Sequence, residues 1–169
     1  MFPPTHHKDL AKFLKSKFEG SCNVRLYWDE YETRSIPVAT HESTHSTFYS
    51  TIGVCDKKLS TPSGHFEFAS IGKLPWLPNA LVSSLFWFEG RSIEDWPLVC
   101  EDVVKLNARS TYRHMVFVPS ECAFVSSAGF SIQWLLGIPI KDSELQISAA
   151  EVNRRVREIY PEWFFNAHA

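Results

Sequence analysis

Residues 41–45 have the types and spacing to bind a metal, since His41, Glu42 and His45 match the H-E-x-x-H pattern of zinc peptidases. On a helix, residues four positions apart share a face, so both imidazoles can bind one zinc ion. The glutamate can then act as a general base on the zinc-bound water. A zinc-dependent peptidase is therefore one hypothesis for this chain.

The residues around this motif favour a strand over a helix. Pro37 lies just upstream, and β-branched and hydroxyl side chains are frequent between residues 38 and 54. On a strand, His41 and His45 would share a face but lie about 13 Å apart, too far to share one metal ion. No downstream helix carries an obvious third ligand. We therefore interpret residues 41–45 as a polar loop and strand entry, and we expect no metal and no cofactor.

The other potentially reactive residues form no recognisable catalytic motif. The cysteines Cys22, Cys55, Cys100 and Cys122 contain no C-x-x-C pair. The sequence also lacks a G-x-S-x-G elbow, a P-loop, a G-x-G-x-x-G and an EF-hand loop. His114 lies in an apolar segment, where we favour a hydrogen-bonded core or sheet-surface histidine over a catalytic base. A Ser–His–Asp or Cys–His arrangement stays open, but we expect no enzyme and assign no catalytic residue.

Two acidic segments are candidates for contact with a partner. One lies near residues 29–32, and the other spans residues 89–102, where five acidic residues accompany one arginine and one tryptophan. Such segments can be solvated loops, or they can form a negative surface with an aromatic anchor that suits a basic protein. The second interpretation gives six contact candidates: Asp29, Glu30, Glu32, Glu94, Asp95 and Trp96.

Composition restricts the class of protein. The chain has 169 residues, of which 44% are hydrophobic and 21% charged, as in ordinary globular domains. Its 17 basic and 19 acidic residues give a net charge of −2, so no global positive field attracts nucleic acid or anionic membranes. Residues 1–20 lack the continuous apolar segment of a secretion signal, and no apolar run approaches the roughly 20 residues of a membrane-spanning helix. We expect a cytoplasmic protein with reduced thiols, and neither nucleic acid, membrane nor small-molecule substrate as a partner.

Apolar periodicity predicts helices at both ends and in the middle of the chain. Spacings of three and four residues indicate helices over residues 8–18 and 78–88, the second opened by Pro78. A closing helix can be capped near residues 142–143, or by Ser148, which has capping-box spacing to Glu151.

Segments that alternate or are rich in β-branched and aromatic residues predict strands, and Pro139 is expected to end the last of them. Because helices and strands do not alternate as βαβ units, we expect an α+β single domain with a mixed, mostly antiparallel β-sheet flanked by helices. The expected strands are residues 22–28, 46–54, 65–71, 111–118 and 130–138.

Seven segments in this order resemble the Suppressor of fused domain in its compact bacterial form. The resemblance covers residues 24–150, preceded by an N-terminal helix region (1–20) and followed by a C-terminal helix (151–169) that matches no family pattern. The segments are LYWDEYE (26–32), FYSTIGVCDK (48–57), FEFASI (66–71), LPNALVSSLFWF (77–88), DVVKL (102–106), YRHMVFVPS (112–120) and IQWLLGIPIKDSEL (132–145).

The resemblance implies a binding function. Bacterial members of this family are similar to antitoxin, or immunity, proteins encoded beside secreted polymorphic toxins, which are often nucleases. In animals the same domain belongs to a regulator that sequesters a transcription factor. We therefore expect a cytoplasmic immunity protein that neutralises a cognate toxin domain by stoichiometric contact, with the six contact candidates as its first-choice surface. The alternatives are the zinc-dependent peptidase and a host-type regulatory protein-binding domain.

Overall fold

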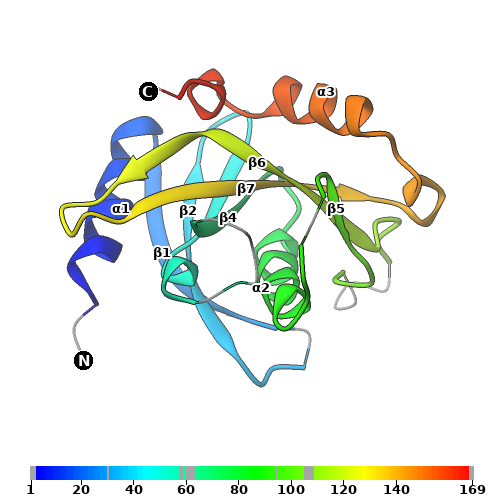
Figure 1. The fold of residues 1–169 in the computed structure, drawn as a ribbon, viewed down its shortest axis with the longest axis horizontal. Coiled ribbons are helices and arrows are strands. Elements are labelled where there is room, and N and C mark those ends of the chain that lie inside the picture. Colours follow the sequence, from blue (N-terminus) through cyan, green and yellow to red (C-terminus); the bar gives the residue numbers. More distant parts are fainter. Residues whose placement is uncertain are drawn as a thin grey trace.

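A seven-stranded mixed β-sheet runs through the molecule and carries helices on both faces (Figure 1). The computed structural model describes residues 3–29, 31–57, 59, 64–93, 95–104 and 109–167. Helix α2 (Leu77–Phe88) packs on one face, and helices α1 (Thr5–Lys17) and α3 (Ala149–Ile159) pack on the other. The fold is thus a single-domain α+β arrangement, as the sequence predicted.

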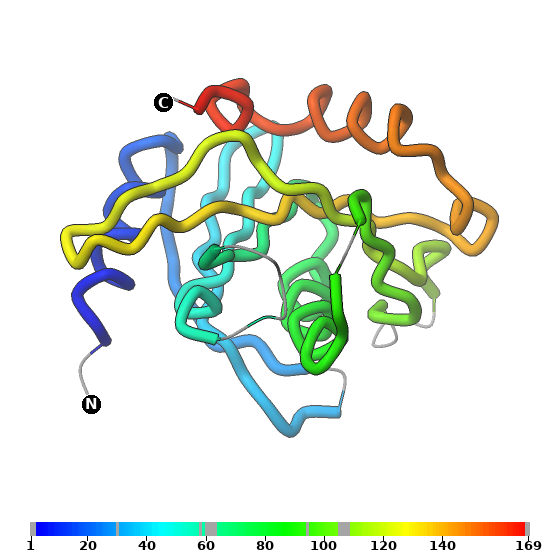
Figure 2. The backbone as a smooth tube through the Cα atoms, viewed as in Figure 1, coloured from blue at the N-terminus to red at the C-terminus, as the bar shows by residue number. Residues whose placement is uncertain are grey.

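The strand order across the sheet is β1-β2-β3-β4-β7-β6-β5, and only the β4–β7 pair is parallel. Figure 2 shows the long β6 and β7 strands running side by side beneath the C-terminal segment. No helix in the described ranges is long and apolar enough to cross a membrane. The strands are β1 Ser21–Trp28, β2 Ser35–Glu42, β3 Thr47–Thr51, β4 His65–Ile71, β5 Leu98–Cys100, β6 His114–Val125 and β7 Ser131–Ile140, and the 3-10 turns are η1 Val54–Asp56, η2 Asp142–Glu144 and η3 Glu162–Phe165.

Two prolines account for the main errors in the predicted strands. The sequence predicted no strand over β2 and ended the last strand at Pro139, and both expectations were wrong. Pro37 lies inside β2 and Pro139 inside β7. A proline cannot donate to a strand ladder, so it is tolerated where a strand has a free side. The β2–β3 pairing begins at Val38 and the β4–β7 pairing ends at Gly137, which leaves each proline with a single neighbouring strand.

Helix α2 buries its predicted apolar stripe against the sheet. Its first turn contains Pro78, as expected. The Phe88 ring meets the rings of Phe68 and Phe117 edge-on, with centroids 5.1 and 5.9 Å apart. Each such fully buried side chain contributes about 1.5–3 kcal/mol through removal of apolar surface from water. The stripe residues, all inaccessible to solvent, are Leu77, Leu81, Leu85 and Phe88.

The opposite face is covered by α1, α3 and the η3 turn. Leu10 and Leu14 of α1 are fully buried there, within the predicted helix. Trp134 of β7 is also fully buried, and its indole N–H donates to Ser50 Oγ at 3.1 Å. Helix α3 begins at the second of the predicted caps, because the Ser148 hydroxyl accepts the Glu151 N–H at 3.2 Å. Two apolar layers therefore enclose the central strands.

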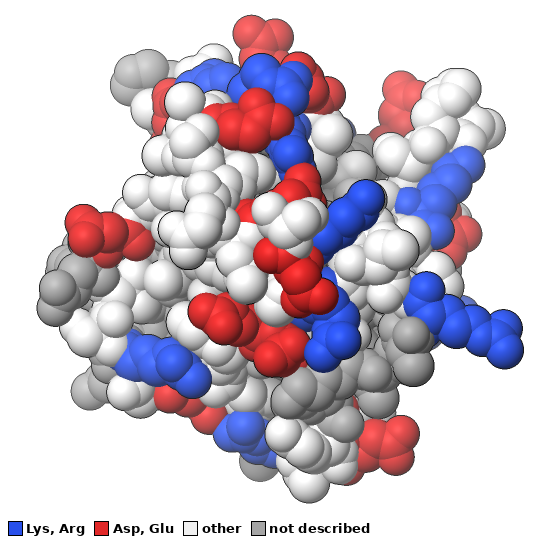
Figure 3. All heavy atoms as spheres, turned by 90° about the vertical axis from the view of Figure 1, so that its right-hand side faces the viewer, with Lys and Arg blue, Asp and Glu red and all other residues white. Residues whose placement is uncertain are grey.

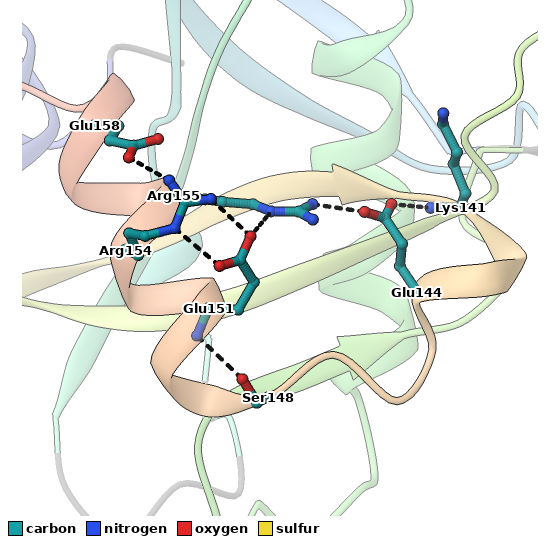
Figure 4. A network of polar contacts seen from close by, with 7 residues as sticks. All are labelled: Lys141, Glu144, Ser148, Glu151, Arg154, Arg155 and Glu158. Carbon is teal, nitrogen blue, oxygen red and sulfur yellow. Dashed lines mark hydrogen bonds and ion pairs between the residues drawn. The ribbon is translucent and has the colours of Figure 1, made fainter.

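The charged residues of α3 pair with one another (Figure 4). Arg154 bonds Glu151 at 2.8 Å and also contacts Glu158, while Arg155 bridges Glu151 and Glu144 at 2.8 and 2.7 Å. On the face shown in Figure 3, acidic and basic side chains are likewise interspersed. The arginines of α3 are therefore neutralised locally rather than presented as a basic patch.

Candidate functional site

The H-E-x-x-H motif lies in the hairpin between β2 and β3. His41 and Glu42 end β2, and the turn is closed by a hydrogen bond from Ser43 N–H to the Ser46 carbonyl at 3.0 Å. His41 is 3% exposed in the sheet, whereas His45 is exposed in the turn. Within the described ranges, neither histidine belongs to a cluster of metal-binding side chains. The interpretation as a polar loop and strand entry is confirmed for residues 43–45, which precede β3, whereas His41 and Glu42 belong to β2.

Cys22 and His41 form a cysteine–histidine pair across β1 and β2. The Cys22 Sγ lies 3.5 Å from His41 Nε2. A nucleophilic pair needs a thiolate beside an imidazolium, hence a lowered thiol pKa. Here burial raises the pKa of Cys22 and lowers the pKa of His41. Both shifts favour the neutral forms, so the pair has the properties of a packing contact.

His114 is a structural residue, as the sequence predicted. It is 3% exposed at the start of β6. Its Nδ1 accepts the Asp102 N–H at 2.9 Å, and its Nε2 lies 2.8 Å from Asp142 Oδ1. Both ring nitrogens are thereby used to hold the β5–β6 connection against η2.

Asp29, the first contact candidate, supports the turn that follows β1. It is 2% exposed, and its carboxylate accepts hydrogen bonds from Thr33 N–H, Thr33 Oγ1 and Arg34 N–H at 2.8–3.2 Å. Burial by itself would raise the pKa of Asp29, but the hydrogen bonds outweigh it and hold the pKa below its ordinary value. Its role as a toxin contact stays a prediction, while in the structure its carboxylate accepts the hydrogen bonds that close the turn.

The remaining contact candidates do not share one environment. Glu30 and Glu94 lie outside the described residues. Glu32 is exposed in the turn, with a φ of 53°. Asp95 is exposed, while Trp96 is half-buried and packs against the α2-face core.

The two acidic segments nevertheless adjoin at a cavity of about 320 Å³. Arg34 Nη1 reaches Glu89 Oε2 at 2.6 Å, which joins the turn after β1 to the loop after α2. The Arg34 guanidinium also lies over the Phe86 ring, 3.5 Å from its centroid. The cavity is lined by aromatic and charged residues of both segments and of α2, including Tyr31, Phe86, Trp87, Arg91, Glu101 and Asp102. Three acidic residues line this cavity: Asp29, which was a contact candidate, and Glu101 and Asp102, which were not.

Strand β1 exposes an apolar stripe. Val24, Leu26 and Trp28 are 51, 60 and 46% exposed. Residues two apart on a strand share a face, and the pairing of Val24 with buried Ala39 places the stripe on the face that α1 and α3 cover elsewhere. Strand β1 ends the sheet, so its outer edge has no strand partner among the described residues. The alternation of this strand was predicted, but not the exposure of its apolar side.

A buried carboxylate beneath η1 escaped the sequence-based prediction. Glu67 of β4 is fully buried, and its carboxylate accepts the backbone N–H groups of Gly53, Val54 and Cys55 at 2.8–3.3 Å. The Thr51 hydroxyl donates to it at 2.6 Å. Burial raises the pKa of Glu67 to about 7, against the opposing effect of these donors. The available signal was a charged residue between two phenylalanines in an otherwise uncharged strand.

The turn above Glu67 also meets the first residues of α1. There, His6 and His7 contact Asp56, and the Cys55 side chain lies close by. These four residues are the cluster of possible metal ligands found in the described part of the chain.

No family model matches this chain, and neither the curated proteins nor the solved structures compared with it gave a match. The resemblance to the Suppressor of fused domain stays a prediction.

Proposed function

We propose that this protein is a cytoplasmic immunity protein that binds and neutralises a cognate polymorphic toxin by stoichiometric contact. The observation that carries the proposal is the exposed apolar stripe Val24–Leu26–Trp28 on the open edge strand β1. Contiguous exposed apolar side chains are typical of protein interaction sites. The sequence resemblance to antitoxin proteins supports the nature of the partner.

The stripe and the strand edge supply two complementary kinds of contact. A partner strand placed against β1 would satisfy its outer N–H and C=O groups, as in recognition by strand addition. The apolar side chains would at the same time be removed from water, at about 25 cal/mol per Å². Trp28 is a suitable anchor, since tryptophan is enriched among residues that dominate binding energy.

The carboxylates at the cavity on the α2 side favour a basic partner. Asp29, Glu101 and Asp102 line it together with Arg34 and Arg91, and Glu32 lies exposed in the adjoining turn. A toxin that is a nuclease must carry a basic surface to bind phosphates. Such a surface would complement these carboxylates and would be withdrawn from the nucleic acid when bound. This charge complementarity supports a nuclease as the toxin. The protein would then compete with nucleic acid for the basic surface of the nuclease.

The first experiment is co-purification of the tagged chain from its source organism, followed by mass spectrometry. The expected result is one stoichiometric partner whose isolated C-terminal domain is toxic when expressed and harmless when co-expressed with this chain. A partner that is a transcription factor would instead support the regulatory alternative. Failure of the chain to suppress the toxicity of any partner would overturn the proposal.

A matched pair of variants tests the surface. Leu26→Lys places a charge in the stripe, and Asn23→Lys places the same charge on the other face of the same strand, where Asn23 is exposed. We expect Leu26→Lys to weaken toxin binding at least about tenfold, equivalent to about 1.4 kcal/mol, and Asn23→Lys to leave it unchanged. Equal affinities for the two variants would exclude the stripe from the interface.

A further inference from the structure

Two histidines, one aspartate and one cysteine converge where the start of α1 meets η1. His6 Nε2 lies 2.6 Å from Asp56 Oδ1, and His7 Nε2 lies 2.7 Å from Asp56 Oδ2. One ligand atom from each of these residues and from Cys55 lies within 4.8 Å of the other three. We propose that this cluster is a zinc site that fastens the N-terminal helix to the sheet.

The donor set fits zinc better than the other common divalent ions. Two imidazole nitrogens, one thiolate and one carboxylate oxygen are the ligand types of tetrahedral zinc sites. Calcium and magnesium prefer six or more oxygen ligands, which this cluster does not offer. A thiolate from Cys55 and the carboxylate of Asp56 also balance the two positive charges of the ion. Burial and the neighbouring Glu67 carboxylate raise the pKa of the Cys55 thiol, so the ion must displace a tightly held proton.

The surroundings hold the ligands in place before any ion binds. Below the cluster, Glu67 fixes η1 through the N–H groups of Gly53, Val54 and Cys55. His65 Nδ1 lies 2.6 Å from the Cys55 carbonyl. Such outer contacts orient ligands and raise metal affinity.

The histidines are confined as well. A Cβ atom at Gly53 would meet His7 Cε1 at 2.6 Å, so the imidazole is seated directly on this glycine. Gly53 has a φ of 97°, in the left-handed region that favours glycine. The His6 ring packs on Phe130, with centroids 4.8 Å apart. His6 and His7 are only 13 and 16% exposed.

The same contacts would act without metal as a purely hydrogen-bonded clamp, in which both imidazoles donate to Asp56. The two arrangements differ in the Nε2 protons, which the clamp requires and which zinc-bound imidazoles lack, and in the Cys55 proton. Zinc binding must displace that proton, so zinc affinity should rise with pH, as for other thiolate sites. The hydrogen-bonded clamp binds no ion at any pH.

This inference departs from the sequence-based expectation of no metal, and it places zinc away from the H-E-x-x-H motif. Metal sites are usually sought from fixed ligand spacings. Here the ligands are two adjacent pairs, residues 6–7 and 55–56, that only the packing of α1 on η1 brings together. The role of the ion is structural and independent of toxin binding.

The test is zinc titration of the chelator-treated full chain, with elemental analysis after dialysis. We expect one zinc ion per chain. The double variant His6→Ala/His7→Ala should lose at least about a hundredfold in zinc affinity, since each ligand or its support is worth about tenfold or more. His45→Ala and His41→Ala are the matched controls and should bind as the wild type does. Far-ultraviolet circular dichroism verifies that each variant is folded.

A second readout identifies the sulfur ligand. Cobalt bound in place of zinc should show a thiolate-to-metal charge-transfer band, which Cys55→Ser abolishes and Cys122→Ser retains. The proposal is overturned by a wild-type chain without stoichiometric zinc, by zinc retained in the folded double variant, or by zinc lost in His41→Ala. Because none of these readouts involves the toxin, their failure leaves the proposed function untouched.

Discussion

The η1 region and strand β1 depart from the usual distribution of polar and apolar groups in opposite directions. Around η1, the carboxylate of Glu67 is completely buried. Along β1, the apolar side chains of Val24, Leu26 and Trp28 are about half exposed. A buried carboxylate is costly unless it is hydrogen-bonded, and an exposed apolar stripe forgoes the free energy of burial.

The difference lies in how each departure is compensated. Glu67 receives three backbone donors and one hydroxyl from residues 51–55 of its own chain. The stripe on β1 is left open to solvent, with an unpaired strand edge among the described residues beside it. A buried carboxylate that is hydrogen-bonded within the chain stabilises the fold. An apolar stripe that stays exposed is available to bind a partner. Three substitutions test this distinction.

The largest effect is expected for Glu67→Ala. Removal of the carboxylate leaves buried N–H groups of η1 without an acceptor, so the free energy of unfolding should fall by about 3–5 kcal/mol. Urea denaturation measures this change. Glu42→Ala, at an exposed position of β2, is the control and should change stability by less than about 0.5 kcal/mol. Similar stabilities for the two variants would contradict a stabilising role for the hydrogen bonds between the Glu67 carboxylate and the N–H groups of η1.

Asp29→Asn should have an intermediate, pH-dependent effect. At neutral pH we expect a loss of about 1–2 kcal/mol, because the amide cannot accept all the hydrogen bonds of the turn. The pKa of Asp29 is lowered in the fold. Its stabilising contribution is therefore complete above the ordinary pKa of 3.8 and is lost as the pH falls through the lower folded-state pKa.

The measurement is the difference in unfolding free energy between wild type and Asp29→Asn from neutral to acidic pH. The difference should shrink once the pH drops below about 4. Glu32→Gln, in the same turn but exposed, is the control and should change stability at neutral pH by less than about 0.5 kcal/mol. A difference that grows on acidification would mean that the hydrogen bonds do not favour the ionised form.

The smallest effect on stability is expected for Leu26→Lys. Its side chain is 60% exposed in the folded chain, so the free energy of unfolding should change by at most about 0.5 kcal/mol. Leu81→Ala, in the fully buried stripe of α2, should cost about 2–5 kcal/mol. Comparable losses in thermal or urea denaturation would show that β1 contributes to the core rather than to a binding surface.

Local periodicity was enough to predict much of the fold. The α2 stripe, the bounds of β4 and the Ser148 cap depend on residues within one turn or strand, and the structure confirms them. Strand β2 was missed because its tolerance of Pro37 depends on where β3 begins to pair. β5 was missed because three residues give too short a pattern.

The candidate site was less predictable because it depends on tertiary contacts. The acidic segments were found from composition, but the meeting of Asp29 with Glu101 and Asp102 at one cavity needs the packing of the β1–β2 turn on α2. The alternation of β1 is visible in the sequence, whereas the absence of a covering element is not. His6 and Asp56 are 50 residues apart and meet only through the docking of α1.

The parallel pairing of β4 with β7 has a consequence for synthesis of the chain. It joins His65–Ser70 to Ile132–Gly137, so the middle of the sheet closes only after about sixty further residues have been translated. Until then β4 is an open edge on the nascent polypeptide, exposed to non-native pairing. Long-range closure of this kind is slow relative to local pairing. During translation, the strand that becomes the centre of the sheet thus waits with one edge open, where a chaperone can protect it.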